Sequence, residues 1–162
     1  MNIFFVDRDP VTAGRSLCDV HTVKMIVESA QLLSTARLSV GQEAPYKATH
    51  RNHPCAIWAR ASRQNYDWLV EHLRALCDEY TARYGKTHLT AQHLPLLSQT
   101  PDLGSGWQEP AQAMPDEFKA SDPVVAYRGY YRFKARTLPR FTYKNRELPS
   151  WLSQDVDGGR CE

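Results

Sequence analysis

The distribution of apolar and polar positions predicts a chain built mainly from helices. In residues 19–36, apolar side chains surround most of a helical cylinder and leave one narrow polar stripe. With about 100° between successive residues, the stripe spans roughly 80°. Its members are His21, Lys24, Glu28, Gln31 and Thr35. A surface helix would show a broad polar face, so we expect this helix to be buried on nearly all sides.

Capping residues and helical periodicity place the other helices. The predicted helices run from Pro10 to about Leu17, from Pro54 to Trp58, from Ser62 to Gly85 and from Pro123 to about Arg136. Five prolines exclude long regular elements from residues 94–123, which we expect to form an irregular loop. The fold class is therefore mainly α, a single-domain helical bundle over residues 1–153 that begins with a short extended segment, followed by a disordered tail over residues 154–162.

Length and composition are consistent with this fold. The chain has 162 residues, 42% of them hydrophobic, which is enough for one domain with a substantial core. The sequence shows neither an apolar run of about 18 to 20 residues nor a secretory signal pattern, so we expect a cytoplasmic protein and no membrane partner. Four widely spaced cysteines favour reduced thiols. We expect a monomer.

The polar stripe is the first candidate site. A histidine, an amine and a carboxylate are costly in a region of low dielectric unless they are paired. In one interpretation, Lys24 and Glu28 form an ordinary helical ion pair whose amine reaches water. In the other, crowding of His21, Lys24 and Glu28 shifts their pKa values, as in active sites.

A second dense polar stretch covers residues 46–54. Its candidates for substrate binding, to which Gln31 is added, are Tyr46, Lys47, His50, Arg51, Asn52 and His53. Pro54 is suited to a first helical turn, so the loop would present these side chains at a helix amino terminus, where an anion such as phosphate is favoured. The alternative is a polar loop in which Asn52 caps a helix.

The third feature is a basic region near the carboxyl end. Between Lys119 and Arg146 there are eight basic residues and one acidic residue, a local charge of +7, interleaved with six aromatic residues. This pattern is typical of surfaces that hold phosphate backbones and stack bases, whereas the plainer interpretation is a solvated basic face over core aromatics. The predicted nucleic-acid contacts are Arg128, Arg132, Lys134, Arg136, Arg140 and Lys144.

Three kinds of chemistry are compatible with these residues. A zinc site would use Cys18, His21, His50 and His53, each pair separated by two residues. Covalent catalysis would use Cys18 as nucleophile and His21 as base. Amine and carboxylate chemistry would use Glu28 to assist attack of an amine at a sugar anomeric carbon, giving an imine from which elimination follows.

Several residues together resemble a known family. His21, Glu28 seven residues later, the Asn52-His53-Pro54 run and a long helix that ends in Glu79, Arg83 and Tyr84 are similar to the pyrimidine-dimer DNA glycosylase/AP lyase family, which includes phage UV endonuclease V. The whole chain also resembles a group of phage proteins, which would place it in the cytoplasm of an infected host cell. The resemblance implies an all-helical domain that binds duplex DNA, extrudes a nucleotide and cleaves the glycosidic bond without metal or cofactor.

The resemblance also implies roles for individual residues. Glu28 occupies the place of the catalytic carboxylate, and His21 that of a histidine one helical stretch earlier. With Glu28 as the acid-base residue, we expect His21 and Lys24 to support or polarise it. The covalent amine is the amino terminus of the chain, which is Met1, because an initiator methionine is normally kept before a residue as large as Asn2. The α-amine has an ordinary pKa of about 7.7 to 8.0, against about 10.4 for lysine, and is therefore the easier nucleophile at neutral pH. The alternatives are a non-enzymatic phage module that binds nucleic acid or a host protein, and a zinc-stabilised domain.

Overall fold

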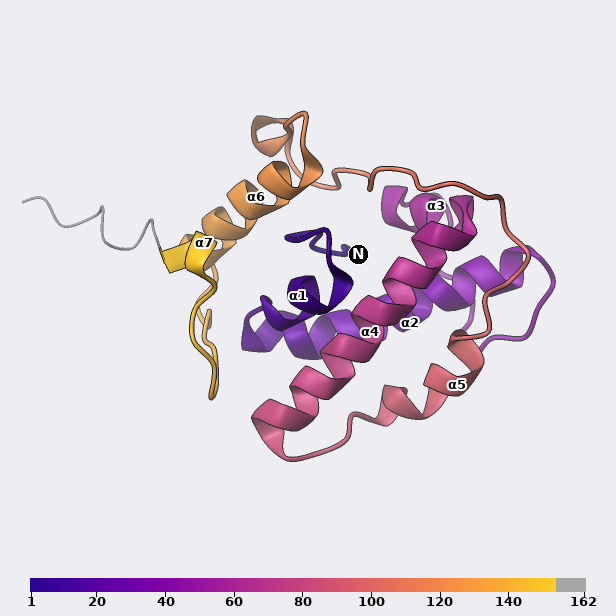
Figure 1. Ribbon diagram of the computed structural model, residues 1–162, viewed down its shortest axis with the longest axis horizontal. Coiled ribbons are helices and arrows are strands. Elements are labelled where there is room, and N and C mark those ends of the chain that lie inside the picture. Colours follow the sequence, from indigo (N-terminus) through magenta and orange to yellow (C-terminus); the bar gives the residue numbers. More distant parts are fainter. Residues whose placement is uncertain (154–162) are drawn as a thin grey trace, which may run out of the picture.

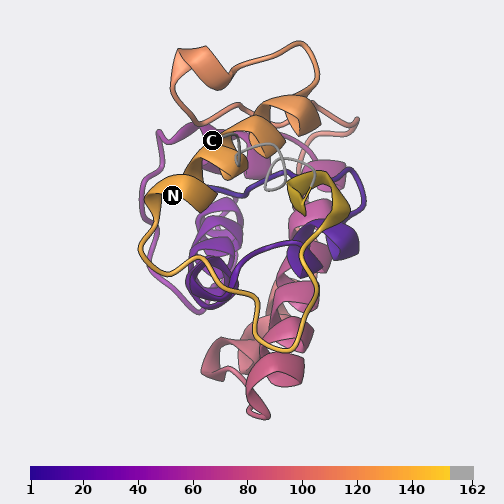
Figure 2. The ribbon, with the colours of Figure 1, turned by 90° about the vertical axis from the view of Figure 1, so that its left-hand side faces the viewer.

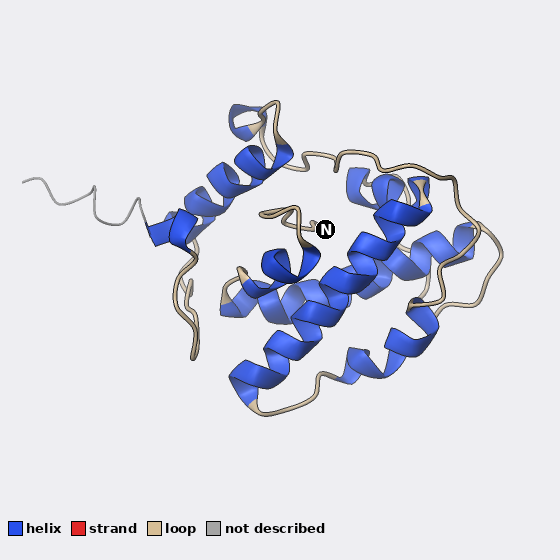
Figure 3. Ribbon diagram, viewed as in Figure 1, coloured by secondary structure: helices blue, strands red, loops and turns tan. Residues whose placement is uncertain are grey.

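The computed structural model describes residues 1–153, and all regular elements in that range are helices (Figures 1 and 3). The mainly α prediction is confirmed. The α-helices are α1 (Pro10–Arg15), α2 (Asp19–Ser39), α3 (Pro54–Ala61), α4 (Arg63–Tyr84), α5 (Leu94–Leu97), α6 (Pro123–Thr137) and α7 (Ser150–Ser153). Two 3-10 turns, η1 (Leu89–His93) and η2 (Asp116–Phe118), complete the description. The tail predicted to be disordered lies outside the described residues.

Local capping chemistry fixes the ends of these helices. The Asp9 carboxylate accepts a hydrogen bond of 2.7 Å from the Thr12 backbone N–H and starts α1. Ser62 caps α4 in the same way, and Gly85 ends it with a φ of 65°, the left-handed conformation that glycine adopts readily. His53 caps α3, because its ring nitrogen Nδ1 accepts a hydrogen bond from the Cys55 backbone N–H, so the cap is His53 and not Asn52.

The two longest helices form the centre of the fold. Figure 1 shows α4 crossing α2, and α4 also packs against α1 and α3. Both helices contribute fully buried leucines to the core, among them Leu32 and Leu33 of α2 and Leu69, Leu73 and Leu76 of α4. Burial of one such side chain contributes about 1.5 to 3 kcal/mol to stability, so these leucines help to hold the two helices in the core.

Burial of α2 is uneven along its length. From Met25 to Arg37 most side chains are buried, as the apolar cylinder predicts. Val20 and Val23 are 42% and 39% exposed, so the expectation of burial on nearly all sides is wrong for the first turns. At this end Phe4 and Tyr131 cover the His21 side of the helix, whereas the face with Val20 and Val23 stays open to solvent.

The amino-terminal segment, residues 1–6, is largely buried and makes a tight turn near its start, without forming a strand. Ile3, Phe5 and Val6 are completely inaccessible. Phe5 packs against Trp68 of α4, while the Val6 carbonyl accepts a hydrogen bond from the Arg128 guanidinium of α6. The segment therefore lies between α6 and the central helices, where Figure 1 shows it.

Two long irregular stretches complete the molecule. The proline-rich loop, residues 94–123, contains just α5 and η2, and Ala113 and Met114 pack it onto the core. Residues 138–149, here called the C-terminal strap, run from the end of α6 along the ends of α2 and α4 (Figure 2). Each stretch brings distant parts of the chain against the amino-terminal half of the molecule.

Candidate active site

A pocket opens where the amino-terminal segment, α2 and α6 meet. Its volume is about 210 Å³, and it is lined by Met1, Asn2, Phe4, His21, Lys24, Met25, Glu28, Ala113, Tyr130 and Lys134. Cavities that hold drug-sized ligands measure about 300 to 1,000 Å³, so this pocket is suited to one small group such as a sugar ring. The four residues predicted as catalytic, Met1, His21, Lys24 and Glu28, all line it.

Glu28 is the centre of the polar contacts in this pocket. One carboxylate oxygen, Oε2, accepts a 3.2 Å hydrogen bond from the Asn2 backbone N–H and lies 3.9 Å from the Met1 amino nitrogen. The other oxygen, Oε1, is 3.6 Å from the Lys24 ammonium. The Glu28 side chain is 15% exposed and that of Lys24 63% exposed. The carboxylate is thus held at the pocket floor, while Lys24 approaches it from solvent.

His21 forms the inner wall of the pocket in an uncharged state. Its ring stacks on Phe4 with centroids 4.4 Å apart, and its Nδ1 is 2.9 Å from the Tyr131 hydroxyl. Burial, aided by the positive charges of Lys134 and Lys24, lowers the pKa of His21 to about 4. At neutral pH, His21 is a neutral hydrogen-bonding group that adds no charge beside Glu28.

The loop of residues 46–54 is attached to the same stripe of α2. The Thr35 hydroxyl donates to the Thr49 carbonyl and accepts from the Thr49 N–H, which fixes the loop beside α2. Burial lowers the pKa of His53, and the positive amino terminus and His50 lower it further, whereas Glu28 opposes the shift. His50 is exposed, with a φ of 47°, and its ring contacts the Thr49 hydroxyl.

The other predicted substrate-binding residues lie elsewhere. Tyr46, Lys47 and Arg51 line a separate open groove of about 410 Å³, where the Tyr46 hydroxyl is 2.9 Å from the Thr90 hydroxyl. Asn52 is exposed and Gln31 is half-buried; neither lines this groove or the pocket around Glu28. Residues 46–54 therefore contribute to this groove, and none of them, His50 and His53 included, lines the pocket around Glu28.

The structure disperses the basic residues near the carboxyl end. Lys134 lines the pocket and lies 5.1 Å above the Tyr130 ring. Arg128 makes an ion pair of 3.0 Å with Asp7, and Arg132 donates to the Trp151 carbonyl. Arg136, Arg140 and Lys144 are exposed. Part of the local positive charge is therefore balanced within the molecule. Lys134, in contrast, places a positive charge in the lining of the pocket.

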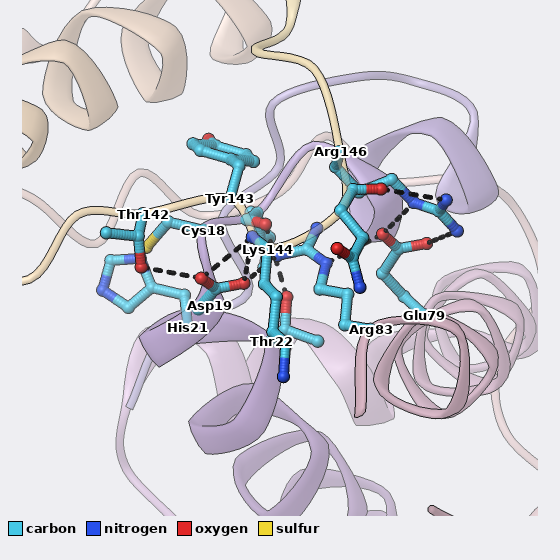
Figure 4. Close-up of polar contacts among 12 residues, drawn as sticks. Cys18, Asp19, His21, Thr22, Glu79, Arg83, Thr142, Tyr143, Lys144 and Arg146 are labelled. Atoms are coloured by element: carbon cyan, nitrogen blue, oxygen red, sulfur yellow. Dashed lines mark hydrogen bonds and ion pairs between the residues drawn. The ribbon is translucent and has the colours of Figure 1, made fainter. Parts of the chain in front are cut away.

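A buried ionic cluster joins the C-terminal strap to α2 and α4 (Figure 4). Arg83 is the centre of this cluster: its side chain is completely buried and lies 2.9 Å from Asp19 and 2.9 Å from Glu79. The strap contributes Arg146, 2.7 Å from Glu79, and Thr142, whose hydroxyl donates to Asp19.

The charges of this cluster are mutually stabilised. Burial alone would raise the pKa of Asp19, but hydrogen bonds from Thr142, Lys144 and Arg83 lower it below its ordinary value. Burial would likewise raise the pKa of Glu79, and hydrogen bonds from Arg146 and Arg83 lower it. Both carboxylates are therefore ionised at neutral pH. The cluster joins the start of α2, the last turn of α4 and the C-terminal strap.

Other pocket residues were not identified from sequence. Asn2, Phe4, Ala113 and Tyr130 line the pocket beside Glu28. The sequence contains one local indication for Asn2, because it is a polar residue next to an apolar run, and the structure shows that it is buried. The positions of Ala113 and Tyr130 depend on contacts between segments more than one hundred residues apart, for example the hydrogen bond from Asn2 to Ala113.

The residues proposed for zinc binding or cysteine catalysis are not arranged for either. In residues 1–153, no three histidine, cysteine or acidic side chains come close enough to share a metal ion. Burial raises the pKa of the Cys18 thiol, which disfavours the reactive thiolate. The ring of His21 contacts the Tyr131 hydroxyl, which also accepts the Cys18 backbone N–H.

Comparison with known proteins identifies the family of the chain. A family model described as pyrimidine dimer DNA glycosylase matches residues 1–93, more than half of the 162-residue chain. The chain belongs to this family, and membership implies pyrimidine dimer DNA glycosylase activity with DNA as the substrate. No significant match was found among the curated proteins or among the solved structures. Across the described part of the chain, no helix has the length and apolar character needed to span a bilayer.

Proposed function

We propose that this protein is a DNA N-glycosylase with AP lyase activity that uses the Met1 amine as nucleophile and Glu28 as acid-base residue. The observation that carries the proposal is the 3.9 Å approach of the Met1 nitrogen to the Glu28 carboxylate inside a pocket. An amine and a carboxylate within reach of one small cavity are the two groups that imine-forming cleavage of a glycosidic bond requires.

The reaction proceeds in two stages. In the first, the neutral amine attacks C1′ of the sugar, and the C1′–N bond breaks with its electron pair going to the departing base. Glu28 stabilises the positive charge that develops on the sugar and accepts the proton lost from the attacking amine, while the departing base is protonated from solvent. In the second, the sugar opens to an imine, a base removes a proton from C2′, and the 3′-phosphate leaves. Water then hydrolyses the imine and restores the amine.

The remaining stripe residues support the carboxylate. Lys24 holds Oε1 at 3.6 Å, which leaves Oε2 directed toward the amino terminus. His21 stays neutral because burial lowers its pKa to about 4, so it contributes a polar wall without competing for the charge of Glu28. Both residues act by shaping and polarising the site.

DNA would bind across the pocket mouth. Lys134 lines the pocket, and the exposed Arg136, Arg140 and Lys144 are available to the phosphate backbone, with Arg128 and Arg132 as further contacts of α6. The phosphate or the displaced base would be positioned by residues outside the pocket lining, namely His50, Arg51, Asn52 and His53, with Tyr46, Lys47 and Gln31. Extrusion of a nucleotide costs a few kcal/mol, which such contacts offset.

Borohydride trapping on duplex DNA tests the proposal. The protein is incubated with a duplex that carries either a pyrimidine dimer or an abasic site, and reduction converts the imine into a stable adduct. The wild-type protein should give an adduct whose modified residue, found by mass spectrometry of peptides, is Met1. Glu28→Gln should reduce the trapping rate by about 100- to 10,000-fold.

A matched variant controls for general effects of losing a carboxylate. Glu71 lies on α4 and makes an exposed ion pair of 3.6 Å with Arg74, so Glu71→Gln should trap at the wild-type rate. An adduct on Lys24 in place of Met1 would contradict the assignment of the nucleophile. Equal rates for the Glu28 and Glu71 variants would contradict the role of Glu28.

A further inference from the structure

Asn2 makes an unusual number of contacts for a residue so close to a chain end. Its side-chain oxygen accepts hydrogen bonds from the backbone N–H groups of Ile3 at 2.8 Å and Phe4 at 2.9 Å. Its side-chain nitrogen donates to the Ala113 carbonyl at 2.9 Å, and its backbone N–H donates to Glu28 at 3.2 Å. One buried residue thus joins the amino-terminal segment, the proline-rich loop and the carboxylate.

The contacts of the Asn2 oxygen determine the direction of the chain. By accepting from two successive N–H groups, the oxygen closes a tight turn, a local structure that asparagine side chains favour. Phe4 adopts a φ of 45° within this turn, a left-handed conformation that is costly for an aromatic residue. The turn brings the Phe4 ring onto His21 and directs residue 1 into the pocket.

The contact of the Asn2 nitrogen fixes the turn in place. Ala113 belongs to the proline-rich loop, which itself hydrogen-bonds to α6 through the Ala111 carbonyl and the Tyr127 hydroxyl, 2.7 Å apart. The amino terminus is therefore held between α2 and a loop that is attached to α6. A free chain end ordinarily loses such order unless it is fixed by contacts of this kind.

From this arrangement we infer that Asn2 is a positioning residue, whose side chain holds the Met1 amine in the direction from which it can attack beside Glu28. The inference rests on the proposed function. Asn2 makes no proton transfer itself; it acts through Met1. A displacement of about 1 Å in a reacting group can reduce a rate by about 100-fold, so loss of this turn should be visible in the rate of imine formation.

Asn2→Leu tests the inference because leucine has a similar size but forms none of the side-chain hydrogen bonds. It is also large enough that Met1 should be retained, which intact-mass measurement checks. The trapping rate at saturating abasic duplex should fall by about 10- to 100-fold, with DNA affinity unchanged. A rate equal to that of wild type would overturn the inference.

Asn65 supplies a matched control. Like Asn2, it is buried and connects a helix to the proline-rich loop, because its amide donates to the Trp58 carbonyl and accepts from the Gln108 N–H. It is not among the residues that line the Glu28 pocket. Asn65→Leu should lower the melting temperature but leave the trapping rate of the folded protein at the wild-type value. An equal rate loss in both variants would show a general packing effect and would refute a specific role for Asn2.

Asn2→Asp separates the turn from the link to the loop. Aspartate keeps an oxygen for the Ile3 and Phe4 N–H groups but has no N–H for Ala113. The turn is what directs the amine, so this variant should recover most of the rate lost in Asn2→Leu. No recovery, in a variant that melts like wild type, would overturn the assignment to the turn.

A measurement independent of catalysis distinguishes this inference from the proposed function. The α-amine is labelled by reductive methylation with ¹³C, and its resonance is compared between parent and Glu28→Gln proteins. Because the amine lies near Glu28, its resonance should differ between the parent and Glu28→Gln proteins. This difference should disappear when both proteins also carry Asn2→Leu. If no imine is ever trapped but this dependence holds, the proposed reaction fails and the positioning role stands. If trapping works and the resonance ignores Asn2→Leu, the positioning role fails alone.

Discussion

Arg83→Met removes the centre of the buried ionic cluster with little change in side-chain length. The guanidinium lies 2.9 Å from Asp19, 2.9 Å from Glu79 and 3.3 Å from the Arg15 carbonyl, and its side chain is fully buried. Methionine fills much of the same space but satisfies none of these oxygens. Two carboxylates would remain in the cluster without their shared cation.

The expected loss of stability depends on the partners that Asp19 and Glu79 keep in the variant. Breaking a buried ion pair by removing one partner costs about 3 to 5 kcal/mol. Here Glu79 keeps Arg146 at 2.7 Å, and Asp19 keeps the Thr142 hydroxyl and the Lys144 N–H, so the lower end applies. A loss of about 3 kcal/mol corresponds to a fall in melting temperature of roughly 6 to 12 °C for a protein of this size.

Thermal and urea unfolding at neutral pH measure this loss, with Arg74→Met as the control. Arg74 pairs with Glu71 at 3.6 Å on the surface, where such pairs contribute at most about 1 kcal/mol. The pKa values of Asp19 and Glu79 are lowered in the folded state, so their stabilisation is present above the unfolded pKa and is lost as the pH falls through the folded pKa. Arg83→Met should therefore also weaken the dependence of stability on acidic pH. Equal losses in the two methionine variants would refute this reasoning.

Two further predictions concern His72 and Lys134. Burial lowers the pKa of His72 from 6.5 to about 4, so the unfolded chain binds a proton at this residue that the folded chain does not. The free energy of unfolding, measured by urea titration, should therefore fall as the pH is lowered from about 7 to 5. The fall should be less steep in His72→Phe. An unchanged slope in that variant would contradict the shift. Lys134→Gln should weaken binding to duplex DNA and reduce the slope of log affinity against log salt by about one, measured by titration at several salt concentrations. Equal slopes would place Lys134 outside the interface.

The helices could be predicted because the signals that define them are local. Asp9, Ser62 and Asp122 each accept a hydrogen bond from a backbone N–H two or three residues later, so the cap and its helix are adjacent in sequence. The Glu28 pocket was partly predictable for the same reason, because the periodicity of α2 places His21, Lys24 and Glu28 on one face. Their common orientation required no knowledge of the tertiary structure.

What periodicity could not show is which distant segments cover each face. The bond between Thr142 and Asp19 joins residues 123 positions apart, and Asn2 meets Ala113 across 111 positions. The count of basic residues was also incomplete as a guide to surface charge, because Arg128 is paired with Asp7 and Arg146 with Glu79. A local charge sum cannot include acidic partners from elsewhere in the chain.

The placement of Tyr130, Lys134 and the C-terminal strap has a consequence for chimeras within the family. The matched residues 1–93 contain the amine and the carboxylate, yet one side of their pocket comes from α6, and the ends of α2 and α4 are held by Arg146 and Thr142. A hybrid joined near residue 93 would inherit Met1 and Glu28 from one parent and the residues that enclose one side of their pocket from the other. Such hybrids should function when both parents supply compatible partners for Asp19 and Glu79, so these pairs are the positions to match first when segments are exchanged.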